Sequence, residues 1–317
     1  MNRSAIWVLL VLAMCCACAH AQGWRPAAGL VQLPIWPGVA PDAQPMPGPE
    51  TVHRSTQLIG GLPVTSVTNV SVPTMTVYPP RGKNTGAAVV VFPGGGFQIL
   101  AMDLEGSEIC DWLTSAGITC VLLKYRVPSA PYDWHCDCRP HNLDVSTPSL
   151  QDAQRTLGLV RLHARAWHVD PHKVGVIGFS AGGFLVAETS TLYKHRLYKP
   201  IDAADRENLR PDFAMAIYPG HLTADGHTFN KNLPVTRNTP PTFLVQAEDD
   251  EVDGVQQALV YFQALKQAHV PTELHIYAHG GHAFGLRHSA EPITGWPSLA
   301  LTWLHTIGIL AGSSTRP

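Results

Sequence analysis

The chain has 317 residues, a formal net charge of −2 at pH 7, and 45% apolar against 15% charged residues. This composition excludes disordered, coiled-coil and collagen-like chains. The 22 basic and 24 acidic residues nearly cancel, and the sequence has no basic stripe, so we expect no nucleic-acid partner. The length allows either two domains or one large α/β core.

The N-terminus is typical of a signal peptide. Arg3 supplies a positive charge, residues 6–14 form an apolar stretch, and the triplet Ala19-His20-Ala21 presents small residues at the two positions that signal peptidase reads. The stretch is too short to span a membrane. We therefore expect residues 1–21 to be removed and the mature protein to be exported to the periplasm or out of the cell. An uncleaved anchor is the alternative.

Seven cysteines fall into two groups. Those at positions 15, 16 and 18 lie in the predicted signal peptide, where lipid attachment to one of them is a further alternative. The remaining four are an even number, which suits disulfides in an exported chain, although the sequence does not give their pairing. They are Cys110, Cys120, Cys136 and Cys138. His135 and His141 flank the last two, but structural zinc sites use wider cysteine spacing, so we favour disulfides or plain loop cysteines over a metal site.

The first part of the mature chain is rich in proline. Residues 26–49 contain seven prolines, which preclude a helix and predict an extended arm on the surface. We assign this arm and the first strands to residues 22–71 and a catalytic domain to residues 72–317. No separate N-terminal domain is expected.

Further along, short apolar runs alternate with amphipathic segments. The apolar runs predict strands at residues 87–92, 118–125, 174–178, 213–218, 242–247 and 273–277. Helices are predicted at residues 104–116, 181–193, 255–268 and 296–307, together with one that begins after Pro148 with Ser149 as its N-cap. Unbroken apolar strands belong to a sheet that is covered on both faces, so we predict a mostly parallel α/β sheet with helices on both faces. Segments 129–148 and 195–212 are expected to be long loops that could bind a ligand.

A serine follows the strand predicted at residues 174–178, within Gly178-Phe179-Ser180-Ala181-Gly182-Gly183. A nucleophilic serine on a sharp strand-to-helix turn needs small neighbours, because its strained backbone brings adjacent residues close together. The strand before and the helix after supply that context, so Ser180 is the predicted nucleophile. The alternative is a glycine-rich turn with an idle serine.

A second glycine cluster, Pro93-Gly94-Gly95-Gly96-Phe97, follows the strand predicted at residues 87–92. A loop at this place donates a backbone N–H to the oxyanion hole of such enzymes, and the N–H of Ala181 would be its partner. A phosphate-binding loop is the competing interpretation. It fits less well, because Ile99 stands where a dinucleotide fingerprint has its last glycine.

The base and the acid are expected on two later loops. Residues 248–253 include five acids after one strand, and residues 279–285 contain His279 and His282 after the next. The order Ser, Asp, His is that of the α/β-hydrolases. The spacing does not choose among Asp249, Asp250 and Asp253. Flanking glycines favour His282 over His279 and His288 as the base.

Taken together, these motifs resemble the α/β-hydrolase carbohydrate esterases of the bifunctional acetylxylan and feruloyl esterase type. The similarity extends over residues 85–310 and rests on the two glycine motifs, Glu105-Gly106, Lys124-Tyr125-Arg126-Val127-Pro128, Leu150-Gln151-Asp152-Ala153-Gln154-Arg155, Ala247-Glu248-Asp249-Asp250 and Gly280-Gly281-His282-Ala283-Phe284-Gly285. The resemblance implies an α/β-hydrolase fold without a large lid domain. It also implies Ser180 as nucleophile, Asp250 as orienting acid, His282 as base, and Gly95, Gly96 and Ala181 at the oxyanion hole.

Two features depart from this pattern. Related lipase-like esterases begin the oxyanion loop with histidine where this chain has Pro93. The segment 129–147, with its Cys-x-Cys, is an insertion near the expected site. Because acyl specificity depends on such loops, the substrate does not follow from the resemblance alone.

The sequence thus predicts a serine carboxylesterase that acts through an acyl-enzyme on acetylated or feruloylated plant polysaccharide, or on another small ester. This chemistry calls for no cofactor and no metal. One alternative is a peptidase or amidase of the prolyl-oligopeptidase group, although those enzymes generally carry a large N-terminal propeller. The other is a non-catalytic binding module with a hydrolase fold.

Overall fold

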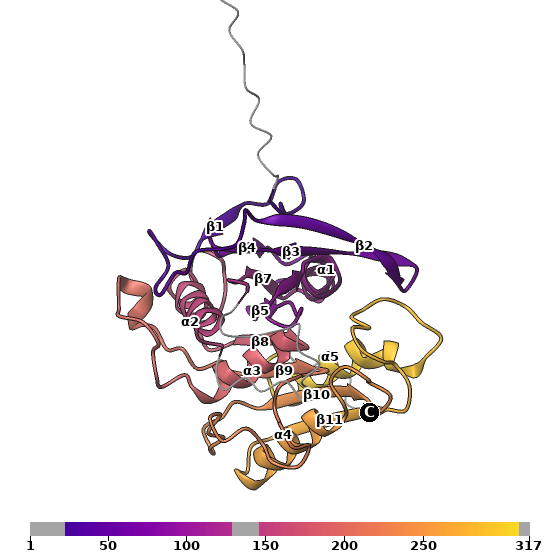
Figure 1. The fold of residues 1–317 in the computed structure, drawn as a ribbon. Helices are drawn as coiled ribbons and strands as arrows, with labels where there is room; N and C mark the ends of the chain where they lie inside the picture. The colour runs from indigo at the N-terminus through magenta and orange to yellow at the C-terminus, as the bar shows by residue number, and fades with distance from the viewer. Residues whose placement is uncertain (1–22, 129–145, 311–317) are drawn as a thin grey trace, which may run out of the picture.

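The computed structural model describes residues 23–128 and 146–310 (Figure 1). The predicted signal peptide and the loop with Cys136 and Cys138 lie outside the described residues. Within the described part of the chain, no helix combines the length and the apolar character that a membrane span requires.

The molecule is built on an eight-stranded, mostly parallel sheet (Figure 1). The strand order is β1-β4-β7-β5-β8-β9-β10-β11. Strands β1 and β4 pair antiparallel, as do β4 and β7, whereas all later neighbours are parallel. In spatial order the strands are β1 (Gln32–Pro34), β4 (Thr74–Tyr78), β7 (Thr119–Lys124), β5 (Ala88–Phe92), β8 (Val174–Phe179), β9 (Ala214–Ile217), β10 (Thr242–Ala247) and β11 (Thr272–Tyr277).

Helices cover both faces of this sheet, which confirms the predicted fold class (Figure 1). Helices α2 and α3 contact each other on one face. On the other face α1 and α5 meet where the rings of Trp112 and Trp296 lie 5.3 Å apart. The α-helices of residues 23–128 and 146–310 are α1 (Glu108–Ser115), preceded by a π-helical turn at Asp103–Ser107, α2 (Thr147–Leu162), α3 (Ala181–Thr191), α4 (Gln256–Gln267) and α5 (Trp296–Thr306).

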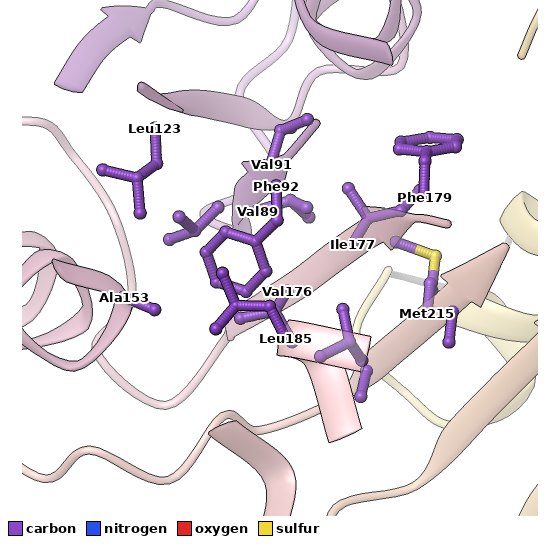
Figure 2. Close-up of a cluster of buried hydrophobic side chains, with 14 of the residues drawn as sticks. Val89, Val91, Phe92, Leu123, Ala153, Val176, Ile177, Phe179, Leu185 and Met215 are labelled. Carbon is purple, nitrogen blue, oxygen red and sulfur yellow. The ribbon is translucent and has the colours of Figure 1, made fainter. Parts of the chain in front are cut away.

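The hydrophobic core packs on both faces of the central strands of the sheet. Figure 2 shows Val176 of β8 on the same side of the sheet as Leu185 of α3, whereas Ile177 points to the other side with Phe179, and all four side chains are fully buried. The predicted unbroken apolar runs therefore correspond to strands with both faces covered. Because these strands pack tightly, the loops at their carboxyl ends are held in fixed positions.

A second, three-stranded antiparallel sheet consists of β2 (Thr51–Ile59), β3 (Leu62–Thr68) and β6 (Ile99–Ala101). Strand β6 directly follows the glycine-rich loop at residues 93–97. Its pairing with β3 therefore holds one end of that loop.

Two local expectations are wrong. Helix α2 begins at Thr147 with Ser146 as N-cap, because Pro148 fits the first helical turn, so Ser149 lies inside the helix. The proline-rich arm is not only on the surface, because Ile35 and Trp36 are buried. The Trp36 indole N–H donates a hydrogen bond of 2.8 Å to the buried carboxylate of Asp152, which ties the arm to α2.

The cysteine pairing that the sequence left open is Cys110 with Cys120. The disulfide joins α1 to the buried strand β7. It therefore links one covering helix covalently to the sheet.

Candidate active site

Ser180 stands at the sharp turn between β8 and α3. Its backbone has φ 51° and ψ −119°, a strained conformation for a residue with a side chain. The neighbouring glycines are required by space: a Cβ on Gly178 would lie 2.0 Å from the carbonyl oxygen of Gly182, and a Cβ on Gly182 would lie 2.0 Å from that of Phe92. The predicted turn is therefore present, with the serine at its apex.

The structure joins Ser180, His282 and Asp250 by hydrogen bonds. Ser180 Oγ lies 3.0 Å from His282 Nε2, and His282 Nδ1 lies 2.8 Å from Asp250 Oδ2. The three residues come from the loops after β8, β11 and β10. Asp250 is buried, and its second oxygen accepts the backbone N–H groups of Val252 and Asp253 at 2.8 and 2.9 Å. The carboxylate is therefore fixed toward the imidazole.

The other histidine and acid candidates lie elsewhere. Asp249 contacts His279 at 3.2 Å and accepts hydrogen bonds from the backbone N–H groups of Gly280 and Gly281. His288 is exposed. Among the described residues, Asp250 is therefore the acid that contacts the Nδ1 of the imidazole facing Ser180.

Asp253, the third acid that the spacing left open, reaches the nucleophile from another side. Its Oδ2 lies 3.3 Å from Ser180 Oγ and 3.8 Å from His282 Nε2. Its side chain is only 7% exposed. The contact between Asp253 and Ser180 was not expected, because the sequence motifs suggested Asp253 only as one candidate for the acid that orients the histidine.

The imidazole is surrounded by negative charge. Burial of His282 disfavours its charged form, but the hydrogen bond to Asp250 and the charges of Asp253, Asp250 and Glu105 outweigh burial and raise the pKa of His282 above its ordinary value. A histidine with a raised pKa is a stronger proton acceptor from a serine hydroxyl.

Glu105 holds the glycine-rich loop against the nucleophile. It is buried and accepts hydrogen bonds from the Gly94 N–H at 2.7 Å and from the Tyr218 hydroxyl at 2.8 Å. Burial raises the pKa of the Glu105 carboxyl. A Cβ on Gly94 would lie 2.9 Å from the Cβ of Ser180, so the loop backbone touches the turn. The motif Glu105-Gly106 pointed to this residue, but no role for it follows from the motif alone.

The predicted oxyanion donors belong to the two segments that meet at this contact, the glycine-rich loop and the turn after β8. The Gly94 N–H is occupied by Glu105. In the described chain, the N–H groups of Gly95, Gly96 and Ala181 are paired with no protein acceptor. Gly95 has φ 127°, and a Cβ there would lie 2.4 Å from the carbonyl oxygen of Ile99, so only glycine fits. These three groups stay the predicted donors.

A cavity of about 450 Å³ opens beside the glycine-rich loop. It lies between that loop, the end of β3 and the proline-rich arm. Its lining residues are Pro47, Thr68, Asn69, Gly95, Gln98, Ile99 and Pro128. Gly95 belongs both to this lining and to the glycine-rich loop, so the cavity adjoins the predicted oxyanion loop.

The metal interpretation of His135, Cys136, Cys138 and His141 falls outside the described residues. Elsewhere, the residues that the structure describes contain no group of three or more histidine, cysteine, aspartate or glutamate side chains placed to hold a metal ion.

Comparison with known proteins places this geometry in a family. Residues 110–303 match the model of the prolyl oligopeptidase family. The chain belongs to this family.

An acetylxylan esterase from Xylanibacter ruminicola is 29% identical over 225 residues, which are 63% of this chain and 42% of that protein. Endo-1,4-beta-xylanase B from Butyrivibrio fibrisolvens is 23% identical over 232 residues, 66% of this chain and 34% of that protein. The chain thus spans less than half the length of either relative.

Solved structures agree on the fold. An acetyl ester-xyloside bifunctional hydrolase from Caldicellulosiruptor lactoaceticus has a TM-score of 0.66 and 29% identity, with 89% of this chain and 97% of that chain covered. MGS-M1, an α/β hydrolase from a deep-sea metagenome library of the Medee basin, has a TM-score of 0.56 and 23% identity, with 81% and 98% covered. The resemblance to acetylxylan-esterase-like α/β-hydrolases, inferred from the motifs, is confirmed.

Proposed function

We propose that this member of the prolyl oligopeptidase family is a serine carboxylesterase. Ser180 is the nucleophile, His282 the base and Asp250 the acid that orients it. The observation that carries the proposal is the unbroken hydrogen-bond chain from Ser180 Oγ through the imidazole to a buried carboxylate, at 3.0 and 2.8 Å. Such a chain transfers a proton away from a hydroxyl that would otherwise be a weak nucleophile.

The reaction runs in two acyl-transfer steps. His282 Nε2 takes the hydroxyl proton while Ser180 Oγ attacks the ester carbonyl, and Asp250 keeps the other proton on Nδ1. The backbone N–H groups of Gly95, Gly96 and Ala181 stabilise the tetrahedral oxyanion. The intermediate collapses when the imidazolium gives its proton to the leaving alcohol. Water, deprotonated by His282, then attacks the acyl-enzyme, and the imidazolium returns the proton to Ser180 Oγ as the bond to the acyl group breaks and the acid is released.

We propose that the substrate is a small ester or a plant polysaccharide ester that carries acetyl or feruloyl groups. Support comes from the two proteins that are 29% identical, which are named as an acetylxylan esterase and as an acetyl ester-xyloside bifunctional hydrolase. The cavity lined by Gly95 provides room for part of such a ligand beside the predicted oxyanion loop. The N-terminal segment 1–21 further supports export to the periplasm or beyond, where a polysaccharide is accessible.

Amide or peptide hydrolysis is a second candidate, favoured by the family to which residues 110–303 belong. The same three side chains can cleave an amide, because acylation of serine follows the same steps. What separates the two activities is the leaving group, so a direct comparison of substrates decides between them.

The test is hydrolysis of p-nitrophenyl acetate, acetylated xylan, methyl ferulate and a prolyl p-nitroanilide by the purified protein, with Ser180→Ala as control. We expect release of acetate or ferulate that is lost in the variant. Cleavage of the anilide alone would establish the peptidase candidate instead. No turnover of any substrate would overturn both and leave a non-catalytic binding module.

A further inference from the structure

Asp253 places a second carboxylate at the nucleophile. Ser180 Oγ lies 3.3 Å from Asp253 Oδ2 and 3.0 Å from His282 Nε2, so the two acceptors are almost equally close to the hydroxyl. The side chain of Asp253 is 7% exposed. Gly220 lies against it, where a Cβ would come within 2.5 Å of both carboxylate oxygens. The carboxylate is therefore confined to a narrow space beside the reacting hydroxyl.

The backbone of Asp253 is fixed independently of this carboxylate. Its N–H donates to Asp250 Oδ1 at 2.9 Å, and its carbonyl oxygen accepts the Gln246 side-chain amide at 2.7 Å. Because both bonds use main-chain atoms, the side chain is aimed at Ser180 by the turn itself.

Asp253 cannot serve the triad in the way that Asp250 does. The Nδ1 of His282 is already bonded to Asp250, and Asp253 faces the opposite ring nitrogen at 3.8 Å. The serine hydroxyl has a single proton to donate. Without a substrate, Asp253 therefore competes with His282 for the proton that the reaction must send to the imidazole.

The position of Asp253 relative to His282 indicates what relieves this competition. The leaving alcohol takes its proton from Nε2, so its oxygen must come within hydrogen-bond distance of that atom. A carboxylate oxygen that lies 3.8 Å from Nε2 borders the same place. Groups attached next to the ester oxygen, on the alcohol part of the substrate, would therefore face Asp253.

We propose that Asp253 is a specificity-determining residue that accepts a hydrogen bond from a free hydroxyl adjacent to the ester on the alcohol part of the substrate. This inference rests on the proposed esterase function and narrows its substrate class to partly acylated polyols such as sugars. The hydroxyl donor satisfies Asp253 and leaves the Ser180 proton to His282. An anionic group at the same position meets like charge in a site with little water and is rejected.

Three small acetate esters test this inference, because they differ only beside the leaving oxygen. 2-Hydroxyethyl acetate offers a hydroxyl donor, 2-methoxyethyl acetate offers none, and O-acetylglycolate carries a carboxylate. We expect wild-type kcat/KM to favour the hydroxyl ester over the methoxy ester by about tenfold to a hundredfold, the factor that one hydrogen bond to a charged group supplies. The acetylglycolate should be the poorest substrate.

Asp253→Asn is the decisive variant, and Asp249→Asn is its matched control on the same loop. Asp249 touches neither Ser180 nor His282, and asparagine keeps an acceptor for the N–H groups of Gly280 and Gly281. We expect Asp253→Asn to reduce the preference for the hydroxyl ester about tenfold and to raise the relative rate on acetylglycolate by a similar factor. Asp249→Asn should keep the wild-type ratios.

The outcomes separate this inference from the proposed function. Hydrolysis of all three esters with ratios unchanged in Asp253→Asn would overturn the role of Asp253 and leave the esterase intact. Failure of the wild type to hydrolyse any of them would overturn both. If Asp253→Asn does not fold, the wild-type ratio still decides, because equal rates on the hydroxyl and methoxy esters would refute the inference.

Discussion

A buried carboxyl behind the nucleophile turn makes the stability of this protein depend on pH. Glu188 lies in α3, the helix that begins after Ser180, and its side chain is fully buried. It accepts a hydrogen bond from the Ser146 N–H at 2.7 Å and another from the Ser146 hydroxyl, so it anchors the N-cap residue of α2. Burial raises the pKa of Glu188 to about 8.

The direction of the pH effect follows from the protonation of Glu188 in the folded and in the unfolded chain. Below pH 4.5, the ordinary value for this carboxyl, Glu188 is protonated in both the folded and the unfolded chain and has no differential effect. Above that pH the unfolded chain loses the proton and the folded chain keeps it until about pH 8, so the free energy of unfolding falls as pH rises through this window. At about 1.4 kcal/mol per pH unit, the loss at pH 7 is about 3 kcal/mol.

Glu188→Gln should remove this loss. Glutamine has the same shape, keeps an acceptor for the Ser146 N–H and can donate to the Ser146 hydroxyl, but it does not ionise. We expect the variant and the wild type to be equally stable at pH 4 and the variant to be more stable by about 3 kcal/mol at pH 7. Urea unfolding at pH 4, 5.5 and 7 measures the difference, with Glu248→Gln as the control for loss of an exposed carboxylate. A difference that stays constant over this range would refute the argument.

Three further predictions concern the site. Asp250→Asn should lower kcat by about 10⁴, because the amide favours the wrong imidazole tautomer, whereas a larger loss in Asp249→Asn would contradict the assignment. The acid limb of the kcat/KM profile should lie above pH 6.5, since the base must be neutral and the pKa of His282 is raised. It should move to lower pH in Asp253→Asn, which removes one of the charges facing the ring; the others belong to Asp250 and Glu105. Gly182→Ala should destabilise the fold by about 1–3 kcal/mol or more in thermal unfolding, because its Cβ would lie 2.0 Å from the carbonyl oxygen of Phe92, and wild-type stability would show that the turn can relax.

The fold could be predicted from the sequence where a single property determined it. The central strands β5 and β8 are buried on both faces, so their apolar runs identified them directly. Strand β2 carries mostly exposed residues, and β6 has three residues that become a strand only because β3 pairs with them. Neither has a local signal. The start of α2 was misplaced for a related reason, since the bond between Ser146 and Glu188 joins segments far apart in the sequence.

The site residues likewise fall into those that a local motif identifies and those that only the fold brings into place. Ser180 and His282 are surrounded by glycines that the local geometry requires, so their motifs are visible in the sequence. The choice among three acids in one loop was not visible, because it depends on which direction each side chain takes after the turn. Glu105 could only be noticed through its place in a motif, because its partners Gly94 and Tyr218 are brought to it by the fold.

Asp250 and Asp253 are coupled through the turn that joins them, and this decides how they should be probed. Oδ1 of Asp250 accepts the N–H groups of Val252 and Asp253, while its Oδ2 contacts His282. The same side chain therefore orients the imidazole and fixes the turn that aims Asp253 at Ser180. Asp250→Ala would remove both effects together and could not tell them apart. Asp250→Asn keeps an acceptor for the turn and replaces the Oδ2 that faces Nδ1 and also accepts the Gln246 side-chain amide at 3.0 Å. A loss of activity in that variant, with the preference for hydroxyl esters preserved, assigns catalysis to Asp250 and specificity to Asp253 separately.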